Sequence, residues 1–442
     1  MTRKLFGTDG VRGVAGELVT AELALALTHV ATANLPVERP RVLIVRDTRE
    51  SGEMLQAAVA AGVAAAGGDA LLGGVLPTPA APLLLGRYGF DLGVVLSASH
   101  NPFQDNGIKF FGGDGYKLSD EAEMAIEVAL EAGREPGPPP AMGRVRELHG
   151  AGEDYLRELS TRFGDLDLDG LDVLLDCANG ATYMLAPEIF RRLGADVTVR
   201  AASPDGRNIN DGCGSTHIEE LARMVPDGGH SIGFAFDGDG DRVLAVDSRG
   251  AVVDGDELLA LAAVHLRRQG RLPGDGVAVT VMTNYGFHTA MQDEGIEVVV
   301  TSVGDRYVLE ELRARGWALG GEQSGHLIDL GFNRTGDGIA GALLTLEALA
   351  GGDLSERGAM EKLPQRLVNV SVRDRSSIDG AERVHEAVRD AERELDGRGR
   401  VLIRPSGTEP LVRVMVEAPT EQEAESVCSR LVALVENELG AR

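Results

Sequence analysis

Short apolar runs alternate with helix-forming segments along most of this chain, and that alternation restricts the fold more than any other feature of the sequence. The runs 41–46, 92–96 and 232–236 are rich in Val, Leu, Ile or Phe, and polar loops follow them. Runs of this length are typical of buried strands, and strand–helix alternation is typical of a parallel sheet covered by helices. We therefore predict an α/β fold built from layers.

The length of the chain and the changes in its composition and predicted secondary-structure pattern indicate several domains. Its 442 residues suggest about three or four domains of ~100–150 residues each. The stretch 133–143 is rich in Pro and Gly and is interpreted as a linker, and from Leu367 onward a small α+β pattern replaces the earlier alternation. We expect the following domains: 1–150, 151–253, 254–365 and 366–442.

The acidic composition excludes some classes of partner. The net charge is −26 and the isoelectric point is about 4.8, which argues against nucleic acid and anionic membranes as main partners. An anionic substrate would need a local positive pocket against this background. Arginine supplies nearly all the cations, because the only lysines are Lys4, Lys109, Lys117 and Lys362. Lys109 is the most notable of them, since it lies just past a predicted strand-end loop.

The cysteines and the lengths of the apolar runs indicate where in the cell the protein resides. Cys177, Cys213 and Cys428 are far apart and have no CxxC spacing, so neither a disulfide framework nor a zinc site is indicated. The N-terminus has no apolar core of signal-peptide length, and no run reaches the ~18 apolar residues of a transmembrane helix. We expect a cytoplasmic protein with no membrane partner.

The first loop with clear chemical potential follows the apolar run 92–96. Ser99 is flanked there by His100, which can carry a proton, and by Asn101, a side-chain donor and acceptor. A serine hydroxyl becomes a useful nucleophile or phosphate carrier only with such help, and Lys109 follows in the same segment. Taken alone, the loop also allows a second interpretation, because serines in strand-end loops are mostly caps or turn formers.

The segment DGDGDR, residues 237–242, is the sharpest motif. Asp237, Asp239 and Asp241 alternate with glycines directly after an apolar strand, so the backbone can curl until three carboxylates converge. A small set of hard oxygen ligands suits Mg²⁺, and uncompensated carboxylates this close would repel one another. A calcium EF-hand is excluded, because Arg242 and Ser248 occupy positions that need Gly and Glu. An acidic hairpin turn remains as the alternative.

The segment RPSGTEP, residues 404–410, follows another predicted strand. Its two hydroxyls and its glycine amide, together with Arg404 and Arg413, can surround a phosphate dianion. The segment is not a P-loop, because the Gly-Lys-Ser ending is missing. An ordinary turn is the alternative interpretation.

Two further loops offer polar groups to a ligand. The turn-rich opening FGTDGVRG, residues 6–13, places Thr8 and Arg12 where they can contact an anion. The loop GGEQSGH, residues 320–326, offers a carboxylate, an amide and a hydroxyl that suit adjacent sugar hydroxyls. For each of these loops, a plain glycine-rich turn is the alternative.

Taken together and in this order, the loops resemble those of the α-D-phosphohexomutase superfamily, and the resemblance covers nearly the whole chain. It rests on residues 6–13 and on the segments SASHNP, NGIKFF, DGDGDR, VGDRYV, GEQSGH and RPSGTEP. The segment NINDGCGST and the glutamine of GEQSGH are more similar to the branch that acts on glucosamine phosphate than to the phosphomannomutase/phosphoglucomutase branch. Arg46 stands where that branch often has Lys, which keeps the charge, and His217 has no role that we can assign.

The resemblance implies three related α/β/α layered domains and a small C-terminal α+β domain around a central cleft, to which each domain contributes one loop. It also implies that Ser99 carries a phosphoryl group. Lys109 or His326 would take the proton from the attacking hydroxyl, and His100 would organise the loop. The implied roles are catalysis for Ser99, Arg12, His100, Lys109, Arg242 and His326; Mg²⁺ binding for Ser99, Asp237, Asp239 and Asp241; and substrate binding for Glu322, Ser324, Arg404, Ser406, Gly407, Thr408 and Arg413.

The reaction that the resemblance implies interconverts glucosamine 6-phosphate and glucosamine 1-phosphate through a phosphoserine enzyme and glucosamine 1,6-bisphosphate. Such an isomerase would supply UDP-N-acetylglucosamine and cell-wall precursor synthesis. Mg²⁺ would be its cofactor, the bisphosphate its activator and intermediate, and a small hexosamine phosphate its partner; self-association would give a homodimer. The alternatives are a phosphomannomutase/phosphoglucomutase of the same mechanism, a non-catalytic sugar-phosphate sensor and a phosphatase.

Overall fold

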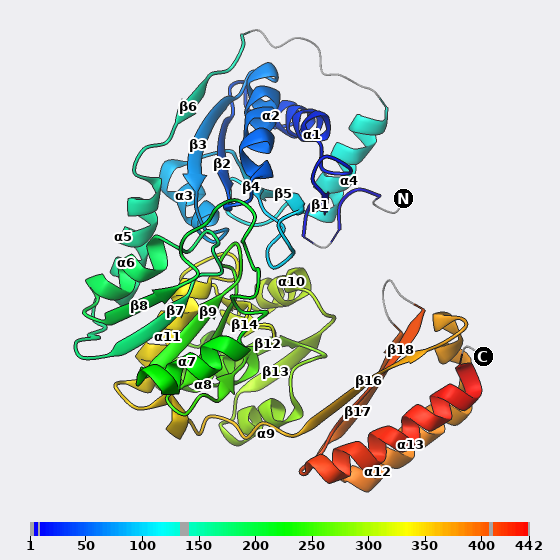
Figure 1. Ribbon diagram of the computed structural model, residues 1–442. Helices are drawn as coiled ribbons and strands as arrows, with labels where there is room; N and C mark the ends of the chain where they lie inside the picture. The colour runs from blue at the N-terminus through cyan, green and yellow to red at the C-terminus, as the bar shows by residue number, and fades with distance from the viewer. Residues whose placement is uncertain (1–3, 8, 133–140, 406–409, 441–442) are drawn as a thin grey trace. The chain divides into compact units, whose positions relative to one another are not determined.

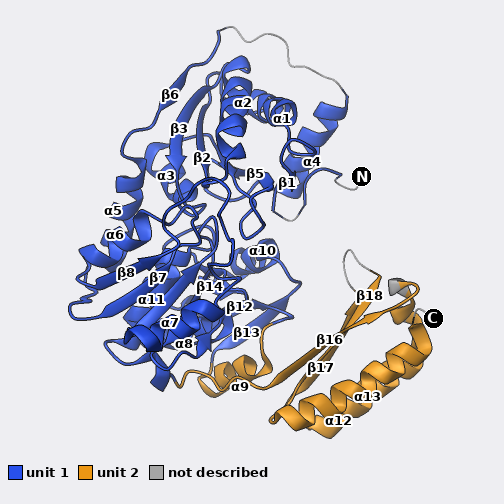
Figure 2. Cartoon of the chain, in the orientation of Figure 1, with its two compact units in different colours: residues 1–282, 296–357 blue, residues 283–295, 358–442 orange. Residues whose placement is uncertain are grey.

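The computed structural model describes residues 4–7, 9–132, 141–405 and 410–440 (Figure 1). These residues form two compact units, which Figure 2 shows in different colours. Unit 1 comprises residues 1–282 and 296–357, and unit 2 comprises residues 283–295 and 358–442. Each unit has a hydrophobic core of its own.

The first sheet of unit 1 has the strand order β1-β5-β4-β2-β3-β6. β2 pairs in parallel with β3 and β4, whereas β5 runs antiparallel to β4 and to β1. Val42, Ile44 and Val94 of the strands pack with Leu27 and Val59 of two helices in one buried cluster, which stabilises this layer. The elements of this part are β1 (Val11–Val14), α1 (Ala21–Ala33), β2 (Arg41–Arg46), α2 (Ser51–Ala65), β3 (Asp69–Val75), α3 (Ala80–Tyr88), β4 (Leu92–Leu96), β5 (Asp105–Gly112), α4 (Asp120–Glu131) and β6 (Val145–Glu147).

The second and third sheets of unit 1 have the strand orders β11-β10-β9-β7-β8 and β13-β12-β14-β15. β9 and β12 are buried at every position, as their apolar sequences require. β9 pairs in parallel with β7 and antiparallel with β10, so the loop between β9 and β10 turns back sharply. The strands of these sheets are β7 (Asp172–Asp176), β8 (Asp196–Arg200), β9 (Ile232–Phe236), β10 (Val243–Asp247), β11 (Val252–Val253), β12 (Gly276–Thr280), β13 (Glu297–Thr301), β14 (Leu319–Gly321) and β15 (Leu327–Asp329). The helices are α5 (Ala151–Phe163), α6 (Leu185–Arg192), α7 (Glu219–Gly228), α8 (Gly255–Arg268), α10 (Asp305–Arg315) and α11 (Gly338–Leu349).

Unit 2 contains an antiparallel sheet of order β16-β18-β17. Figure 1 shows two long helices, α12 and α13, along one face of this sheet. Val412 and Val414 of β18 pack there with Val384, Val427 and Leu431 of the helices. The elements are α9 (Tyr285–Asp293), β16 (Gln365–Ser371), α12 (Glu382–Leu395), β17 (Arg400–Pro405), β18 (Leu411–Glu417) and α13 (Glu421–Leu439).

The predicted fold class is confirmed, because layered α/β elements are followed by a small α+β module, but several elements of unit 1 were not predicted, among them β1, α3, β5 and β6. α3 was missed because Pro77 and Pro79 suggest only a break after a strand, although Pro79 is the N-cap of α3 and Pro82 lies in its first turn, where proline is tolerated. β5, which carries Lys109, was not recognised as a strand, and Lys109 was placed only as lying just past the strand-end loop. The sequence before α2 suggests Ser51 as the N-cap, but Ser51 is the first helical residue, and its hydroxyl accepts a hydrogen bond from Asn106 at 2.8 Å.

Other expectations concern single features of the chain. Among the described residues, no helix has both the length and the apolar character needed to cross a membrane. The three cysteines are buried free thiols. Most of the predicted linker 133–143 lies outside the described residues.

One carboxylate anchors the N-terminal segment of unit 1. Glu127 in α4 accepts hydrogen bonds from the backbone N–H groups of Lys4, Leu5 and Phe6, at 2.7–3.2 Å. The side chain of Phe6 is buried beneath these bonds. Because hydrogen bonds to an ionised carboxylate are stronger than neutral ones, Glu127 fixes the segment that leads to Arg12.

We expect Glu127→Ala to destabilise unit 1 by about 2 kcal/mol, since buried amide groups lose a charged acceptor. The loss should appear as a lower Tm and as faster hydrogen exchange of the amides of residues 4–6. Glu131→Ala, on the same helix, removes an exposed ion pair with Lys4 and should lower the Tm much less, since exposed ion pairs contribute little to stability. Equal losses in the two variants would contradict the anchoring role of Glu127.

Candidate active site

Ser99 lies in a tight loop directly after β4, residues 97–105, which we call the serine loop. Its backbone is left-handed, with φ of 53°, a conformation that is uncommon outside glycine. The side chain is 1% exposed, and its Oγ donates to Oδ2 of Asp237 at 2.5 Å and lies 3.3 Å from Nδ1 of His100. The N–H of Ser99 donates to Oγ of Ser97 at 2.9 Å. The loop therefore holds the hydroxyl of Ser99 against a carboxylate that follows a different strand.

The acidic loop follows β9 and brings three carboxylates together. Asp237, Asp239 and Asp241 are buried, and one oxygen of each lies within 4.8 Å of the others. Gly238 permits the approach to the serine loop, because a Cβ at this position would lie 2.6 Å from the carbonyl oxygen of Ser99. The convergence expected from the alternation of Asp and Gly is thus present in the structure.

The oxygens of this cluster fit a divalent cation. Oδ1 of Asp239 and Oδ1 of Asp241 are buried and have no hydrogen-bond donor among the described residues. Oδ2 of Asp239 accepts from Lys109 at 2.7 Å and from Thr78 at 2.6 Å, which leaves its Oδ1 available to a ligand. Burial, followed by the charges of Asp241 and Asp239, raises the pKa of Asp237 well above its usual value. Hard oxygens in such a small set suit Mg²⁺.

Three cationic side chains surround the cluster: Arg12 on β1, Lys109 on β5, and Arg242 at the end of the acidic loop. Lys109 is 1% exposed and its Nζ lies 2.7 Å from Asp239 and 3.1 Å from Asp9. Burial disfavours the ammonium, but the charges of Asp239 and Asp9 outweigh it and raise the pKa of Lys109. Lys109 therefore stays charged, which disfavours the expected role as a proton acceptor.

The two histidines of the site have different environments. Burial and two neighbouring arginines lower the pKa of His100 to about 4, so its ring is neutral at pH 7. Nε2 of His326 accepts the N–H of Gly336 at 3.1 Å, while Nδ1 faces Oδ1 of Asp241 at 3.6 Å. The same Nε2 lies 3.7 Å from Oδ2 of Asp305. Burial disfavours the imidazolium, but the charges of Asp241 and Asp305 outweigh it and raise the pKa of His326.

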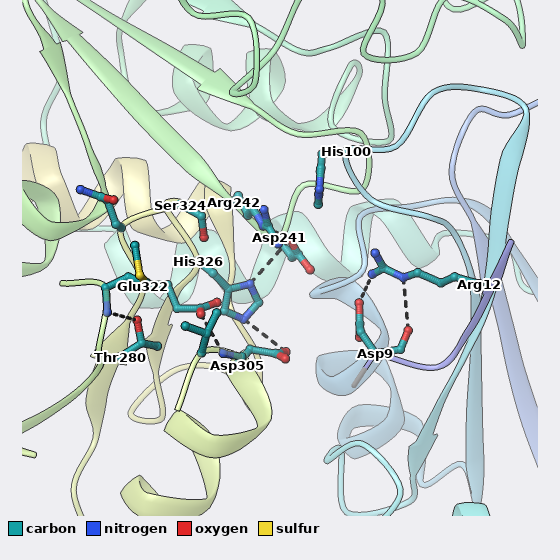
Figure 3. A pocket seen from close by; sticks show the side chains of 14 residues that line it. Asp9, Arg12, His100, Asp241, Arg242, Thr280, Asp305, Glu322, Ser324 and His326 are labelled. Carbon is teal, nitrogen blue, oxygen red and sulfur yellow. Dashed lines mark hydrogen bonds and ion pairs between the residues drawn. The ribbon is translucent and has the colours of Figure 1, made fainter. Parts of the chain in front are cut away.

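A cavity of about 460 Å³ opens beside these groups. Figure 3 shows Arg12 paired with Asp9 on one side, and Glu322 and Ser324 on the other. Oε1 of Glu322 accepts the N–H of Gly304 at 3.0 Å, which fixes its carboxylate at the wall. The size of the cavity and its charged and hydroxyl-bearing walls suit a polar ligand of sugar-phosphate size.

The structure brings together all the predicted site residues of unit 1. Those on the cavity wall are Arg12, His100, Asp241, Arg242, Glu322, Ser324 and His326. Those buried behind the wall are Ser99, Lys109, Asp237 and Asp239.

The predicted phosphate-binding residues lie in unit 2. Arg404 on β17 and Arg413 on β18 are direct cross-strand partners. Burial and the like charge of Arg413 lower the pKa of Arg404, which is the electrostatic setting of an anion site. Ser406, Gly407 and Thr408, and also Thr8 of the opening turn, lie outside the described residues.

Sequence reasoning missed several residues that support the site. Lys117 pairs with Asp9 and Asp305 and so ties the opening turn to the start of α10. The scarcity of lysine in this chain was a usable signal for Lys117, whereas the flanking prolines concealed the role of Thr78. The other missed residues, Arg49 and Asn210, act through the backbone of the serine loop.

Four family models match successive parts of the chain. They are described as phosphoglucomutase/phosphomannomutase, alpha/beta/alpha domains I, II and III and the C-terminal domain. In that order they match residues 3–136, 153–250, 254–367 and 367–434.

Proteins named phosphoglucosamine mutase are similar to the chain over its whole length. Those of Anoxybacillus flavithermus and Bacillus subtilis are each 48% identical over 99% of this chain, which spans 100% and 99% of their lengths. That of Desulforudis audaxviator is 51% identical over 98% of this chain and 97% of its own length.

Solved structures share the fold. A phosphoglucomutase/phosphomannomutase family protein from Burkholderia thailandensis aligns with a TM-score of 0.83 and 22% identity, covering 99% of both chains. The N-acetylphosphoglucosamine mutase of Aspergillus fumigatus, in complex with GlcNAc-6P and magnesium, aligns with a TM-score of 0.68 and 19% identity over 99% of this chain and 96% of its own. With the four domain matches and the full-length relatives, the prediction from the loops is confirmed, and the chain belongs to the phosphoglucomutase/phosphomannomutase family of α-D-phosphohexomutases.

Proposed function

We propose that this chain interconverts glucosamine 6-phosphate and glucosamine 1-phosphate through a phosphoserine at Ser99 and a glucosamine 1,6-bisphosphate intermediate. The observation that carries the proposal is the buried Oγ of Ser99, 2.5 Å from Asp237 and next to two further buried aspartates. Phosphoryl transfer depends on a positioned oxygen and on neutralised charge more than on covalent chemistry by the protein. A serine held among carboxylates and fixed cations meets both needs.

The choice of sugar rests on the relatives. Proteins 48–51% identical to this chain over nearly its full length are named phosphoglucosamine mutase. Glu322 and Ser324 are proposed to contact sugar hydroxyls at the cavity wall. The Aspergillus fumigatus N-acetylphosphoglucosamine mutase forms complexes with GlcNAc-6P and magnesium and, as a variant, with glucose 1,6-bisphosphate, which supports the same ligand classes here.

A Mg²⁺ ion would be held by Asp237, Asp239 and Asp241 and by phosphorylated Ser99. The two buried carboxylate oxygens without a donor, on Asp239 and Asp241, support this ligand set. When bound there, the ion supplies charge neutralisation for the phosphoserine oxygens.

The protein's own cations would complete the charge balance. Lys109 stabilises the phosphoryl group in transfer and is itself held between Asp239 and Asp9. Arg12 does the same from the cavity wall. Arg242 adds a third positive charge beside Asp241. The neutral ring of His100 lies next to Ser99 and organises its loop.

The sugar would have to bind in two orientations. The O1 hydroxyl of the 6-phosphate attacks the phosphorus on Ser99, the bond from phosphorus to Oγ breaks, and the proton of O1 passes to Oγ as the bisphosphate forms. The bisphosphate then turns, Oγ of Ser99 attacks its 6-phosphoryl group, the bond from phosphorus to O6 breaks, and the proton of Oγ passes to O6. Arg404 and Arg413, with residues 406–408, would hold the phosphate that is not reacting, while Glu322 and Ser324 read hydroxyls in both orientations.

The domain boundaries are proposed at 1–150, 151–253, 254–365 and 366–442. We also propose a cytoplasmic location, in keeping with the three free thiols, and assembly as a homodimer. The product would feed UDP-N-acetylglucosamine synthesis.

The turnover of three hexose phosphates tests which sugar phosphate is the preferred substrate. With Mg²⁺ and a trace of bisphosphate, kcat/KM for glucosamine 6-phosphate should exceed that for mannose 6-phosphate and glucose 6-phosphate by about tenfold or more. A preference for mannose phosphate or glucose phosphate would favour a phosphomannomutase/phosphoglucomutase. No turnover of any of the three would favour a sugar-phosphate sensor.

Ser99→Ala should lower kcat by more than about 1,000-fold while the protein stays folded, because no other oxygen can carry the phosphoryl group. Intact mass should find the phosphate on the wild type and none on the variant. Ser248→Ala, whose serine pairs with Asp353 away from the cavity, serves as control. Near-normal turnover by Ser99→Ala would refute the carrier role.

Asp239→Asn should weaken Mg²⁺ binding by about 100-fold or more, since a hard anionic ligand becomes a neutral one. Titration calorimetry of the purified protein measures this directly, without turnover. Asp211→Asn, at an exposed position, should leave the affinity unchanged. An unaltered affinity in Asp239→Asn would remove this residue from the proposed ligand set.

A further inference from the structure

The serine loop points its backbone carbonyls toward one buried side chain. Ser99 adopts a left-handed backbone conformation, which a non-glycine residue holds only when its surroundings enforce it. The guanidinium of Arg49, from the segment between β2 and α2, lies inside the curve of the loop and is 0% exposed. It donates to four carbonyl oxygens of the loop, those of Ser99, Asn101, Pro102 and Asp105.

The guanidinium uses its full hydrogen-bonding capacity. Nη2 donates to Ser99 at 2.9 Å and to Asn101 at 2.8 Å, and Nη1 donates to Asp105 at 3.0 Å as well as to Pro102. Nε donates to Oδ2 of Asp47 at 2.9 Å. Arginine has five N–H donors in a planar fork, and all five are paired here. The carboxylate of Asp47 also balances the buried charge.

Asp47 extends the same network to the backbone N–H of Ser99. Its Oδ2 accepts from Oγ of Ser97 at 2.6 Å, and Oγ of Ser97 accepts from the N–H of Ser99 at 2.9 Å. Both backbone polar groups of Ser99, the N–H and the carbonyl, are therefore tied to the Asp47–Arg49 pair.

A second side chain reaches the same carbonyls from another part of the chain. Nδ2 of Asn210, in the loop between β8 and α7, donates to the carbonyl of Ser99 at 2.9 Å and to that of Asn101 at 3.1 Å. Each of these two carbonyls thus accepts one bond from Arg49 and one from Asn210. Asn210 has a φ of 59°, which asparagine tolerates better than most residues.

We propose that Arg49 and Asn210 are positioning residues for the phosphoryl carrier: they hold the backbone of the Ser99 loop so that Oγ stays aligned with the acidic cluster whether or not it carries phosphate. The inference rests on the proposed function and deepens it. Gain and loss of a dianionic group at Ser99 change the forces on the loop at every turnover. Bonds to its carbonyl oxygens from a saturated guanidinium resist a shift without contacting the phosphoryl group itself.

Lysine cannot replace Arg49 in this role. An ammonium has three donors in a compact head and cannot span four carbonyls and a carboxylate at once. Arg49→Lys should therefore keep the buried charge and yet release part of the loop. We expect kcat to fall by about 100-fold, as for a misaligned reacting group, and KM to change by less than about threefold.

The experiment compares Arg49→Lys with Arg357→Lys. Arg357 pairs with Asp247 and Glu257 in unit 1 and does not contact the loop. Both variants should lower Tm, but Arg357→Lys should keep kcat within about twofold of wild type, since distant sites act independently. The second readout is the single-turnover rate at which glucose 1,6-bisphosphate phosphorylates Ser99, followed by intact mass, which should fall in parallel with kcat for Arg49→Lys alone.

Asn210→Gly tests the same positioning role if Arg49→Lys does not fold. Glycine keeps the left-handed backbone and removes both donated bonds, and the phosphorylation rate should fall about tenfold. A wild-type phosphorylation rate in a folded Arg49→Lys or in Asn210→Gly would overturn the positioning role. Absence of hexosamine phosphate turnover in the wild type would instead refute the proposed mutase, so the two failures are distinguishable.

Discussion

The mutual repulsion of three buried carboxylates next to a serine hydroxyl is the constraint on which the rest of unit 1 depends. Asp237, Asp239 and Asp241 bring one oxygen each within 4.8 Å of the others, in a place with almost no solvent. Such a group is stable only if positive charge lies close by. The chain supplies it from separate segments, with Arg12 and Lys109 on the antiparallel edge of the first sheet.

Paired charges also connect the cavity wall around Glu322 to the part of unit 1 that contains the first sheet. Lys117 pairs with Asp305, and Arg306 donates to Glu123 at 2.9 Å, so the start of α10 is held against α4 and the segment before it. Glu322 in turn binds the backbone of Gly304. A chain with a net charge of −26 thus places two of its few lysines, Lys109 and Lys117, against carboxylates beside one cavity, whose wall includes Asp9 and Asp305.

The sequence predicted those parts of the fold and site that are encoded locally. The strands 41–46, 92–96 and 232–236 and the convergence of the acidic loop follow from patterns within a few residues. Arg49 and Asn210 could not be found in this way, because their partner Ser99 lies 50 and 111 positions away. Thr78 is 161 positions from Asp239. Bonds of this kind become visible only when the strands are placed side by side.

The central claim is that one oxygen, Oγ of Ser99, carries every phosphoryl group that moves. Rapid quenching of enzyme labelled with ³²P at Ser99, mixed with unlabelled glucosamine 6-phosphate, tests it most directly. The account predicts that label leaves the protein at the rate of turnover and ends in the C1 phosphate of glucosamine 1-phosphate. Product that forms while the label remains on the protein would contradict the account.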